Sequence, residues 1–582
     1  MKNKTIQRIY QIAKPHIKTI IIVSILSLII AVTEIAKPYI IKIAIDDYLT
    51  QGIYQKGIFP IWTLGLIYIG IVILENIIDF ITTTTTNKMG EKIIYDMRNK
   101  LFRYIQYANI TFHDKTPAGT LFARITSDVE DISTLFKDVI ATFIKDIVIV
   151  VTIMVVILCM SVQLGLIALT VIPLIIFFSV TLISIANKME NVAKTRRTEL
   201  NTFLAESIYG AKLIKIFNIQ SEKQKECEEK TKAFRDAKSK SKIPQSILPA
   251  IMKILENIAI ALITWACVQH WFGISIEAGV LYVFVTYIQK LFEPITRIVE
   301  NIEVVQEAGV SINKIYDILD EKELLEKTDD GIILDKVKGK IEFKNVWFSY
   351  DNKNWVLKNV SFVIEPGQSV ALVGKTGSGK TTITSLINRF YNIQKGEILL
   401  DGININGINL RSLREHIGMI LQDPFIFADT IKSNIKMNLP ISDEEVEKSI
   451  KLASAEDFVN NLPNGIEEVA KERGASFSAG QKQLIAFARA FAHNPDIFIL
   501  DEATANIDTY TESLIQKSID KISENKTSIF IAHRLSTIVN VDKIIVLMNG
   551  EIVEQGNHNE LVTSGGYYAK LYNSYYESLG WK

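Results

Sequence analysis

Six apolar stretches in the first 300 residues restrict the fold of this chain more than any other feature of its sequence. They are 19 to 24 residues long and occupy residues 17–40, 58–81, 139–160, 164–185, 248–271 and 280–298. A helix of 22 residues reaches roughly 33 Å, enough to cross a hydrocarbon core about 30 Å thick. We therefore expect six membrane-spanning helices. The sixth is the weakest, because Lys290, Glu293 and Arg297 interrupt it, and we expect it to line protein or water.

The distribution of positive charge predicts the topology. The two long loops, 82–138 and 186–247, hold 8 and 14 Lys and Arg residues, whereas the three short connections hold only Lys42 and Lys56. Positive charge stays in the cytoplasm, which places both long loops and both chain ends inside. The loops have a helical pattern, so we expect the flanking spans to continue beyond the bilayer. The lysine-rich N-terminus predicts a short amphipathic helix at the membrane surface.

Composition excludes several other classes of protein. Apolar residues make up 48% of the chain, and 64 basic residues balance 64 acidic ones, which removes the electrostatic case for a nucleic-acid partner. The three cysteines, Cys159, Cys227 and Cys267, lack the spacing of a disulfide framework or a zinc site. The function therefore has to come from local sites.

The second half of the chain has a different character. A charged segment at 321–340 breaks the helical pattern and is interpreted as a linker after a transmembrane domain at 1–320. From 341 to 582, short β-rich runs alternate with turns and helical patterns, which is typical of an α/β domain. The predicted fold is an all-α six-helix transmembrane domain fused to a cytoplasmic α/β domain that binds nucleotide.

A phosphate-binding loop carries the nucleotide prediction. The run VALVGKTGSGKTT places a Gly-x-x-x-x-Gly-Lys-Thr motif between an apolar strand and a helix. Its glycines let backbone amides face phosphate oxygens, Lys380 offers charge to the β- and γ-phosphates, and Thr381 offers a hydroxyl to Mg²⁺. The predicted ATP-binding residues of this loop are Gly374, Lys375, Thr376, Gly377, Ser378, Gly379, Lys380, Thr381 and Thr382.

Two further apolar strands end in polar residues. The run DIFILDEA ends in Asp501, which suits Mg²⁺ coordination, and Glu502, which can orient or deprotonate an attacking water. The run SIFIAH places His533 where an imidazole can reach the γ-phosphate. On its own such a histidine is more often structural.

Together these motifs identify a family, because the chain resembles an ATP-binding cassette exporter half-transporter of the bacterial lipid and multidrug type. WFSY, GKTGSGKT, ILQDPFIF, LDEA, ANID and IAHRLST occur in the family's order, and FSAGQ stands where the family has LSGGQ. The long loops are similar to the family's intracellular loops. Around 110–115 and 204–210 they would carry short coupling helices that touch the nucleotide-binding domain.

The resemblance implies the remaining site residues. Tyr350 would stack on adenine, and Gln422 would help to hold Mg²⁺, take part in catalysis and link the ATP site to the membrane domain. Catalysis would rest on Glu502 and His533 as well. In the family two halves close face to face, and each ATP lies between the phosphate loop of one half and the signature of the other. The residues that this chain would present to its partner are the signature Ser478, Ala479, Gly480 and Gln481, and the loop residue Asp508.

The resemblance leaves several alternatives open. Ala479 replaces a signature glycine and Lys471 stands where the family often has glycine, departures that are familiar in exporters built from two different halves. A homodimer and a heterodimer both remain possible. The leading function is ATP-driven export of amphipathic compounds or lipids at the cell membrane. An importer with the exporter fold and an ATP-gated or regulatory membrane ATPase are the alternatives. The substrate is unassigned, and Glu256 within the fifth span is a candidate contact for cations.

Overall fold

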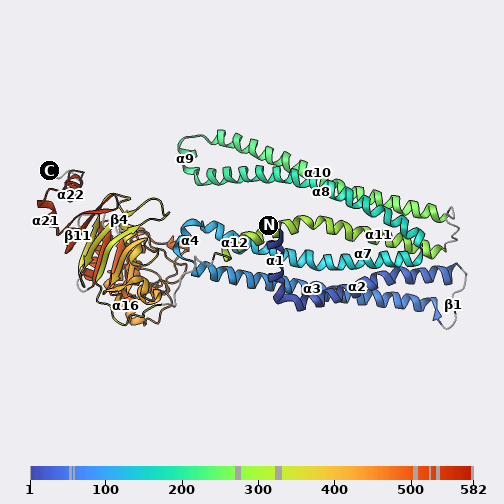
Figure 1. The fold of residues 1–582 in the computed structure, drawn as a ribbon, viewed down its shortest axis with the longest axis horizontal. Coiled ribbons are helices and arrows are strands. Elements are labelled where there is room, and N and C mark those ends of the chain that lie inside the picture. Colours follow the sequence, from blue (N-terminus) through green and yellow to red (C-terminus); the bar gives the residue numbers. More distant parts are fainter. Residues whose placement is uncertain are drawn as a thin grey trace. The chain divides into compact units, whose positions relative to one another are not determined.

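The computed structural model describes residues 2–50, 55–56, 59–268, 277–321, 331–501, 509–523, 526–531 and 538–578. The chain divides into two compact units. The first comprises Met1–Gln106 and Pro117–Lys322, and the second comprises Tyr107–Thr116 and Glu323–Lys582 (Figure 1).

The first unit is built from long helices. The helices of this part of the chain are α1 (Lys2–Ala13), α2 (Ile17–Ile43), α3 (Ile61–Tyr107), α5 (Ala118–Ala123), α6 (Val129–Thr134), α7 (Ala141–Met160), α8 (Val162–Tyr209), α9 (Ala211–Ile216), α10 (Gln220–Val268), α11 (Ala278–Glu300) and α12 (Ile302–Leu319). The 3-10 turn η1 (Lys14–His16) and the π-helical segments η2 (Ala44–Leu49), η3 (Arg124–Asp128) and η4 (Leu135–Ile140) continue these helices, and β1 (Gln55–Lys56) pairs with β2 (Phe59–Pro60). The six-residue α4 (Ile110–Lys115) follows α3 directly and belongs to the second unit.

Five helices among the described residues are long and apolar enough to cross a membrane. They lie within Lys4–Leu49, Ile61–Tyr107, Ala118–Met160, Pro173–Tyr209 and Gln220–Cys267. The sixth predicted span is helical, as α11, but it is not among these five. The expectation that the spans outrun the bilayer is confirmed, because α3, α8 and α10 have 47, 48 and 49 residues, or about 70 Å each.

Apolar side chains from five helices form the core of the first unit. Ile149 and Ile153 of α7, Ile263 of α10 and Phe284 and Tyr287 of α11 are fully buried together, with contributions from α2 and α8. The sixth predicted span, α11, therefore packs its apolar side chains against other helices of this unit, as expected of a span that lines protein. α8 and α10 run side by side, with α9 at their tip (Figure 1).

The second unit contains two sheets and the helices that cover them. Its strands are β3 (Ile341–Phe348), β4 (Leu357–Ile364), β5 (Ser369–Val373), β6 (Lys395–Leu400), β7 (Ile403–Asn404), β8 (Ile417–Ile420), β9 (Ile497–Asp501), β10 (Thr527–Ile531), β11 (Lys543–Met548) and β12 (Glu551–Gly556). Its helices besides α4 are α13 (Lys380–Ile387), α14 (Leu410–Glu415), α15 (Ile431–Lys436), α16 (Asp443–Leu452), α17 (Glu456–Asn460), α18 (Ala479–His493), α19 (Thr509–Ser523), α21 (His558–Thr563) and α22 (Tyr567–Ser578), with the 3-10 turns η7 (Ile405–Gly407), η8 (Gly465–Glu467) and η9 (Glu472–Gly474).

The larger sheet has the order β12-β11-β5-β10-β9-β8, and every pair is parallel except β11 with β12. Its central strands β5 and β10 are buried along their whole length, which explains their continuous apolar sequences. The smaller sheet, β4-β3-β6-β7, is antiparallel. The prediction of an α/β domain is confirmed.

Alternate residues of the parallel sheet feed two separate cores. Val370 and Leu372 of β5 pack with the antiparallel sheet and α13 on one face. Ala371 and Val373 pack on the other face, against α15, α18 and α19. The sheet is therefore covered on both sides, and only its edges and strand ends are left for a ligand.

The end of the predicted linker lies against the second unit. Ile332 forms an isolated bridge with Ile408, and the Leu334 amide donates to Ser412 Oγ at 2.9 Å. Asp401 accepts hydrogen bonds from the amides of Lys338 and Lys340 at 2.7 and 2.8 Å. Residues 331–340 are therefore fixed on this unit.

Candidate functional site

The sheet topology brings the predicted phosphate and metal residues to one edge. In the register of the four parallel strands, Ile531 lies opposite both Leu372 and Asp501, and Leu500 lies opposite Ile420. The carboxyl ends of β5, β10, β9 and β8 therefore meet at the same edge of the sheet. The phosphate loop follows β5, Asp501 ends β9, and Gln422 comes two residues after β8. Motifs far apart in the sequence thus lie side by side.

Three predicted residues cannot be placed. Glu502, Asp508 and His533 lie outside the described residues. Glu502 directly follows Asp501, and His533 comes two residues after the end of β10. The strands that precede Glu502 and His533 end at the same edge of the sheet. Because the three residues themselves are not described, their roles stay predictions.

The phosphate loop has the backbone that its glycines predict. Gly377 and Gly379 have φ angles of 84° and 104°, which are left-handed conformations that favour glycine. Gly379 is the N-cap of α13, so the loop leads directly into the positive end of that helix dipole. A side chain at Gly374 would lie 2.3 Å from the carbonyl oxygen of Leu547. The strand of the loop is therefore held too tightly for any larger residue.

The polar groups of the loop fit a phosphate ligand. Lys380 is buried, and its ammonium donates to the carbonyl oxygens of Gly374 at 2.7 Å and Lys375 at 3.2 Å. Ser378 Oγ is also buried and has no hydrogen-bond partner among the described residues. Thr381 is exposed on the first turn of α13. Thr381, Gln422 and Asp501 all offer oxygen atoms, the ligands that Mg²⁺ prefers.

Tyr350 lies beside the phosphate-loop helix. Its hydroxyl is 3.1 Å from Thr382 Oγ1 of α13, and about half of the residue is exposed. The turn that follows it is held by Asp351, whose carboxylate accepts from the Asn354 and Lys353 amides. These amides and the Ser349 hydroxyl keep the pKa of Asp351 well below its usual range. The position and exposure of Tyr350 suit a residue that stacks on a base.

The signature residues form the start of α18. Ser478 Oγ accepts from the Gln481 amide at 3.2 Å, and Gln481 Oε1 accepts from the Ser478 amide at 2.9 Å, a reciprocal capping box. Ala479 is the exposed first residue of the helix, whereas Gly480 is buried. Lys471 lies upstream on the surface, with its amide bonded to Ser476 Oγ at 3.3 Å.

Gln483 is a site residue that the sequence did not reveal. It is buried on α18, and its side-chain amide donates to the carbonyl oxygens of Leu421 at 3.2 Å and Gln422 at 2.7 Å. The signature helix therefore holds the segment that carries Gln422. A polar residue on the buried face of α18 was the only signal in the sequence.

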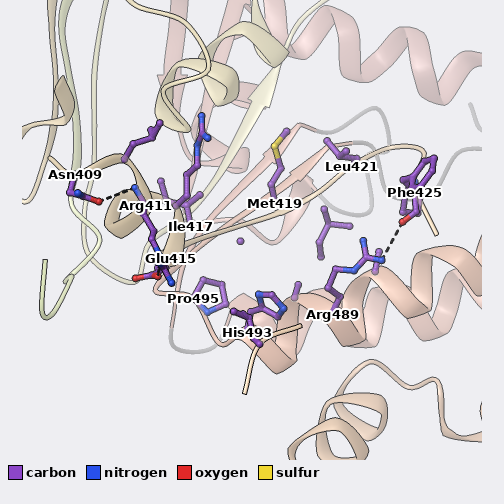
Figure 2. A pocket seen from close by; sticks show the side chains of 18 of the residues that line it. Asn409, Arg411, Glu415, Ile417, Met419, Leu421, Phe425, Arg489, His493 and Pro495 are labelled. Atoms are coloured by element: carbon purple, nitrogen blue, oxygen red, sulfur yellow. Dashed lines mark hydrogen bonds and ion pairs between the residues drawn. The ribbon is translucent and has the colours of Figure 1, made fainter. Parts of the chain in front are cut away.

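A cavity of about 900 Å³ lies next to this segment (Figure 2). Its lining residues come from α14, β8, the segment after β8 and α18, and include Met419, Leu421, Phe425, Arg489 and His493. Arg489 donates to the carbonyl oxygens of Phe425 and Asn434 at 3.2 and 2.8 Å. Burial lowers the pKa of His493, so its imidazole is neutral near pH 7. No residue of the phosphate loop lines this cavity.

Charged residues of the predicted spans occur in ion pairs. Lys253 Nζ donates to Glu256 Oε1 at 2.5 Å. Glu256, the candidate contact for cations, is thus paired with a lysine of its own helix. Four further pairs join different helices, namely Lys37–Glu75, Lys290–Glu34, Lys145–Asp79 and Arg297–Asp146, and Arg297 also pairs with Glu293 of its own helix. Such pairing lowers the cost of charge in a membrane.

A unit of membrane-spanning helices joined to an α/β unit with this phosphate loop defines an ATP-hydrolysing membrane transporter. Family models agree, since the "ABC transporter transmembrane region" matches residues 20–295 and "ABC transporter" matches residues 357–505. The chain belongs to the ABC transporter family, with the half-transporter organisation of its exporters. The predicted fold class and family are confirmed.

Relatives match nearly the whole chain. The probable multidrug resistance ABC transporter ATP-binding/permease protein YheH of Bacillus subtilis is 36% identical, over 89% of this chain and 77% of that protein. The ATP-dependent lipid A-core flippase of Syntrophus aciditrophicus is 32% identical, over 97% and 94%. The solved structure of a bacterial Atm1-family ABC exporter with ATP bound has a TM-score of 0.79 and 26% identity, over 96% and 98%.

Proposed function

We propose that this chain is one half of a dimeric ATP-driven exporter of amphipathic small molecules or lipids in the cell membrane, with both termini in the cytoplasm. The observation that carries the proposal is the meeting of the phosphate loop, Asp501 and the Gln422 segment at one sheet edge. Relatives named for multidrug resistance and for lipid A-core flipping support the substrate class.

Each residue of the site then has a role. The phosphate loop and Lys380 bind the phosphates, and Tyr350 stacks on the adenine. Thr381, Gln422 and Asp501 would hold Mg²⁺, which neutralises charge on the phosphates. Glu502 acts as the general base for the attacking water, with His533 at the γ-phosphate. Ser478, Ala479, Gly480, Gln481 and Asp508 face the site of the second half.

Transport follows from the differential affinity of ATP for two arrangements of the halves. ATP favours the closed pair, and hydrolysis removes the γ-phosphate contacts that hold it, so the substrate site between the membrane helices is exposed to alternate sides of the membrane. The second half is another copy of this chain or a related chain. Glu256 remains a proposed substrate contact, reachable by a cation only in competition with Lys253.

An exposed apolar surface supports a partner. At the tip of α8, α9 and α10, five large side chains are 60% to 91% exposed in the single chain: Ile208, Tyr209, Leu213, Ile216 and Phe217. Solvent-exposed apolar clusters of this kind mark interaction sites. The predicted coupling segment 204–210 lies at the end of α8, so we assign the short helix that follows it, α9, as the second coupling helix, which contacts the nucleotide-binding domain of the partner.

The test is the size, ATPase activity and transport activity of the chain in lipid nanodiscs and vesicles. We expect a dimer whose ATPase activity falls about 100-fold or more in Glu502→Gln, since a general base contributes 10²- to 10⁴-fold, while ATP binding is retained. Turnover within a few fold of the parent would remove Glu502 as the base.

ATP-dependent accumulation of an amphipathic dye in inside-out vesicles supports export. Depletion of a preloaded dye would favour an importer, and hydrolysis without movement a regulatory ATPase. A monomer without activity would point to a different second half.

A further inference from the structure

The aromatic rings of Phe348, Tyr350 and Tyr391 form a cluster next to the phosphate-loop helix. Phe348 and Tyr350 meet edge to face with centroids 4.8 Å apart, and Tyr350 and Tyr391 meet in the same way at 5.0 Å. Phe348 also lies 5.7 Å from Tyr391, which closes the triangle. Phe348 is fully buried in β3 and anchors the cluster. Because the two rings are in contact, a shift of the Tyr350 ring changes the packing of Tyr391 directly.

Tyr391 stands on a rigid base. It follows the phosphate-loop helix α13 by four residues, and its neighbour Arg389 donates to the carbonyl oxygens of Ile405 and Ile408 at 2.8 and 2.6 Å. The Tyr391 hydroxyl donates to Asp114 Oδ2, a residue 277 positions away. Burial, this hydrogen bond and the Asp114 charge raise the pKa of Tyr391, so the hydroxyl keeps its proton at physiological pH.

Asp114 lies on α4, the short helix that follows α3. Asn109 caps α4 by accepting from the Phe112 amide at 3.1 Å, and Phe112 is buried. α4 groups with the nucleotide-binding unit, yet only Ala108 and Asn109 separate it from the 47-residue α3. A movement of α4 is therefore passed covalently to a membrane helix.

We infer that the Tyr391–Asp114 hydrogen bond transmits the presence of a purine base at Tyr350 to α4, and through α4 to α3. The inference rests on the proposed stacking role of Tyr350. Tyr391 is a positioning residue, since it acts through Tyr350 and touches no reacting atom. The base end of the nucleotide thus has its own connection to the membrane helices, separate from the Gln422 segment at the phosphate end.

Hydrogen exchange of the full chain in nanodiscs tests this connection, with ATP and Mg²⁺ added to the Glu502→Gln protein. In that parent we expect ATP to change exchange at least threefold in two peptides, one covering the phosphate loop and one covering 107–116. In Tyr391→Phe, which keeps the ring, the phosphate-loop effect should persist and the effect on 107–116 should be lost. Tyr95→Phe on the exposed face of α3 is the matched control and should behave as the parent.

Substitutions of Asp114, the acceptor of the Tyr391 hydrogen bond, give a second test. Asp114→Asn keeps a side-chain oxygen for the Tyr391 hydroxyl and should preserve the effect on 107–116, whereas Asp114→Ala should abolish it. In vesicles that hold the chain with Glu502 intact, Tyr391→Phe should lower the amount of amphipathic dye moved per ATP at least threefold, with ATP affinity within twofold of the same chain with Tyr391.

Each other outcome decides against a specific claim. An unchanged ATP effect on 107–116 in Tyr391→Phe overturns the inference, and so does a parent in which only the phosphate-loop peptide responds. A parent in which neither peptide responds overturns the ATP site itself, and the proposed function with it.

Discussion

At the scale of single residues, the ATP site depends on groups that would be costly to bury without a ligand or a partner. Lys380 is buried with its ammonium on two backbone carbonyls, and Ser378 presents a buried hydroxyl without a partner among the described residues. A buried polar group without a partner needs an explanation, and a bound phosphate provides one for Ser378. The exposed Thr381 and the strand-end Asp501 complete a set of donors and acceptors suited to a nucleotide and its metal.

Lys380→Ala should weaken ATP binding by about tenfold or more, because a hydrogen bond from a charged group contributes about 1.5–3 kcal/mol. Titration with a fluorescent ATP analogue measures the loss. Lys517→Ala, an exposed lysine on α19, is the control and should leave the affinity unchanged. Equal affinities of the Lys380→Ala and parent proteins would contradict the assigned role.

At the scale of elements, α18 connects three parts of the site. Its capping box contains two signature residues, its buried Gln483 holds the backbone at Gln422, and its last turn reaches the cavity of Figure 2. The signature residues therefore have a structural role inside this chain besides their proposed role at the partner's ATP. The capping box of α16, which contains no signature residue, allows the structural role to be separated from the role at the partner's ATP.

Ser478→Ala and Ser442→Ala each remove the cap of a helix, α18 and α16 respectively. Each should cost about 1 kcal/mol of stability, or roughly 2–4 °C in Tm for a domain of this size. Only Ser478→Ala should also lower ATPase activity, by about tenfold or more, if its hydroxyl contacts the partner's phosphate with a strength near 1.5 kcal/mol. Equal ATPase activities in the two variants would reduce Ser478 to a helix cap.

At the scale of the whole molecule, the proposed function requires a second half. The phosphate loop and the signature lie on one polypeptide, but the family's arrangement needs each to face a second half. The exposed apolar tip of α8, α9 and α10 has the same implication for the membrane unit. Both features support the proposed partner, and they lie in different units of the chain.

Ile216→Asp should uncouple the transporter, because it places a charge in the apolar tip without touching a buried side chain. We expect ATP-driven transport to fall about tenfold or more while ATP binding stays within twofold, since loss of an apolar contact of this size costs about 1.5–3 kcal/mol. Ala211→Asp, on the exposed first turn of the same helix, is the control. Normal transport by Ile216→Asp would exclude the tip as a coupling contact.

The sequence predicts what is encoded locally. The phosphate loop, the strands β5, β9 and β10 and the long helices follow from apolar runs and motifs that are continuous in the chain. The partners of Lys145 and Asp146 do not, since neighbours in sequence bind different helices. The Tyr391–Asp114 bond and the Gln483 contacts span 277 and about 60 residues, and only the folded chain brings these groups together.

Because α3 is one unbroken helix of 47 residues, the number of residues in it is as important as their identity. Each residue advances an α-helix by about 100° around its axis, so adding one residue to α3 would turn everything beyond it by that angle. An insertion of seven residues would restore the azimuth to within about 20°, but would move the end of the helix by about 10 Å. Substitutions on the exposed surface of α3 are therefore compatible with its function, whereas a change in its length is not.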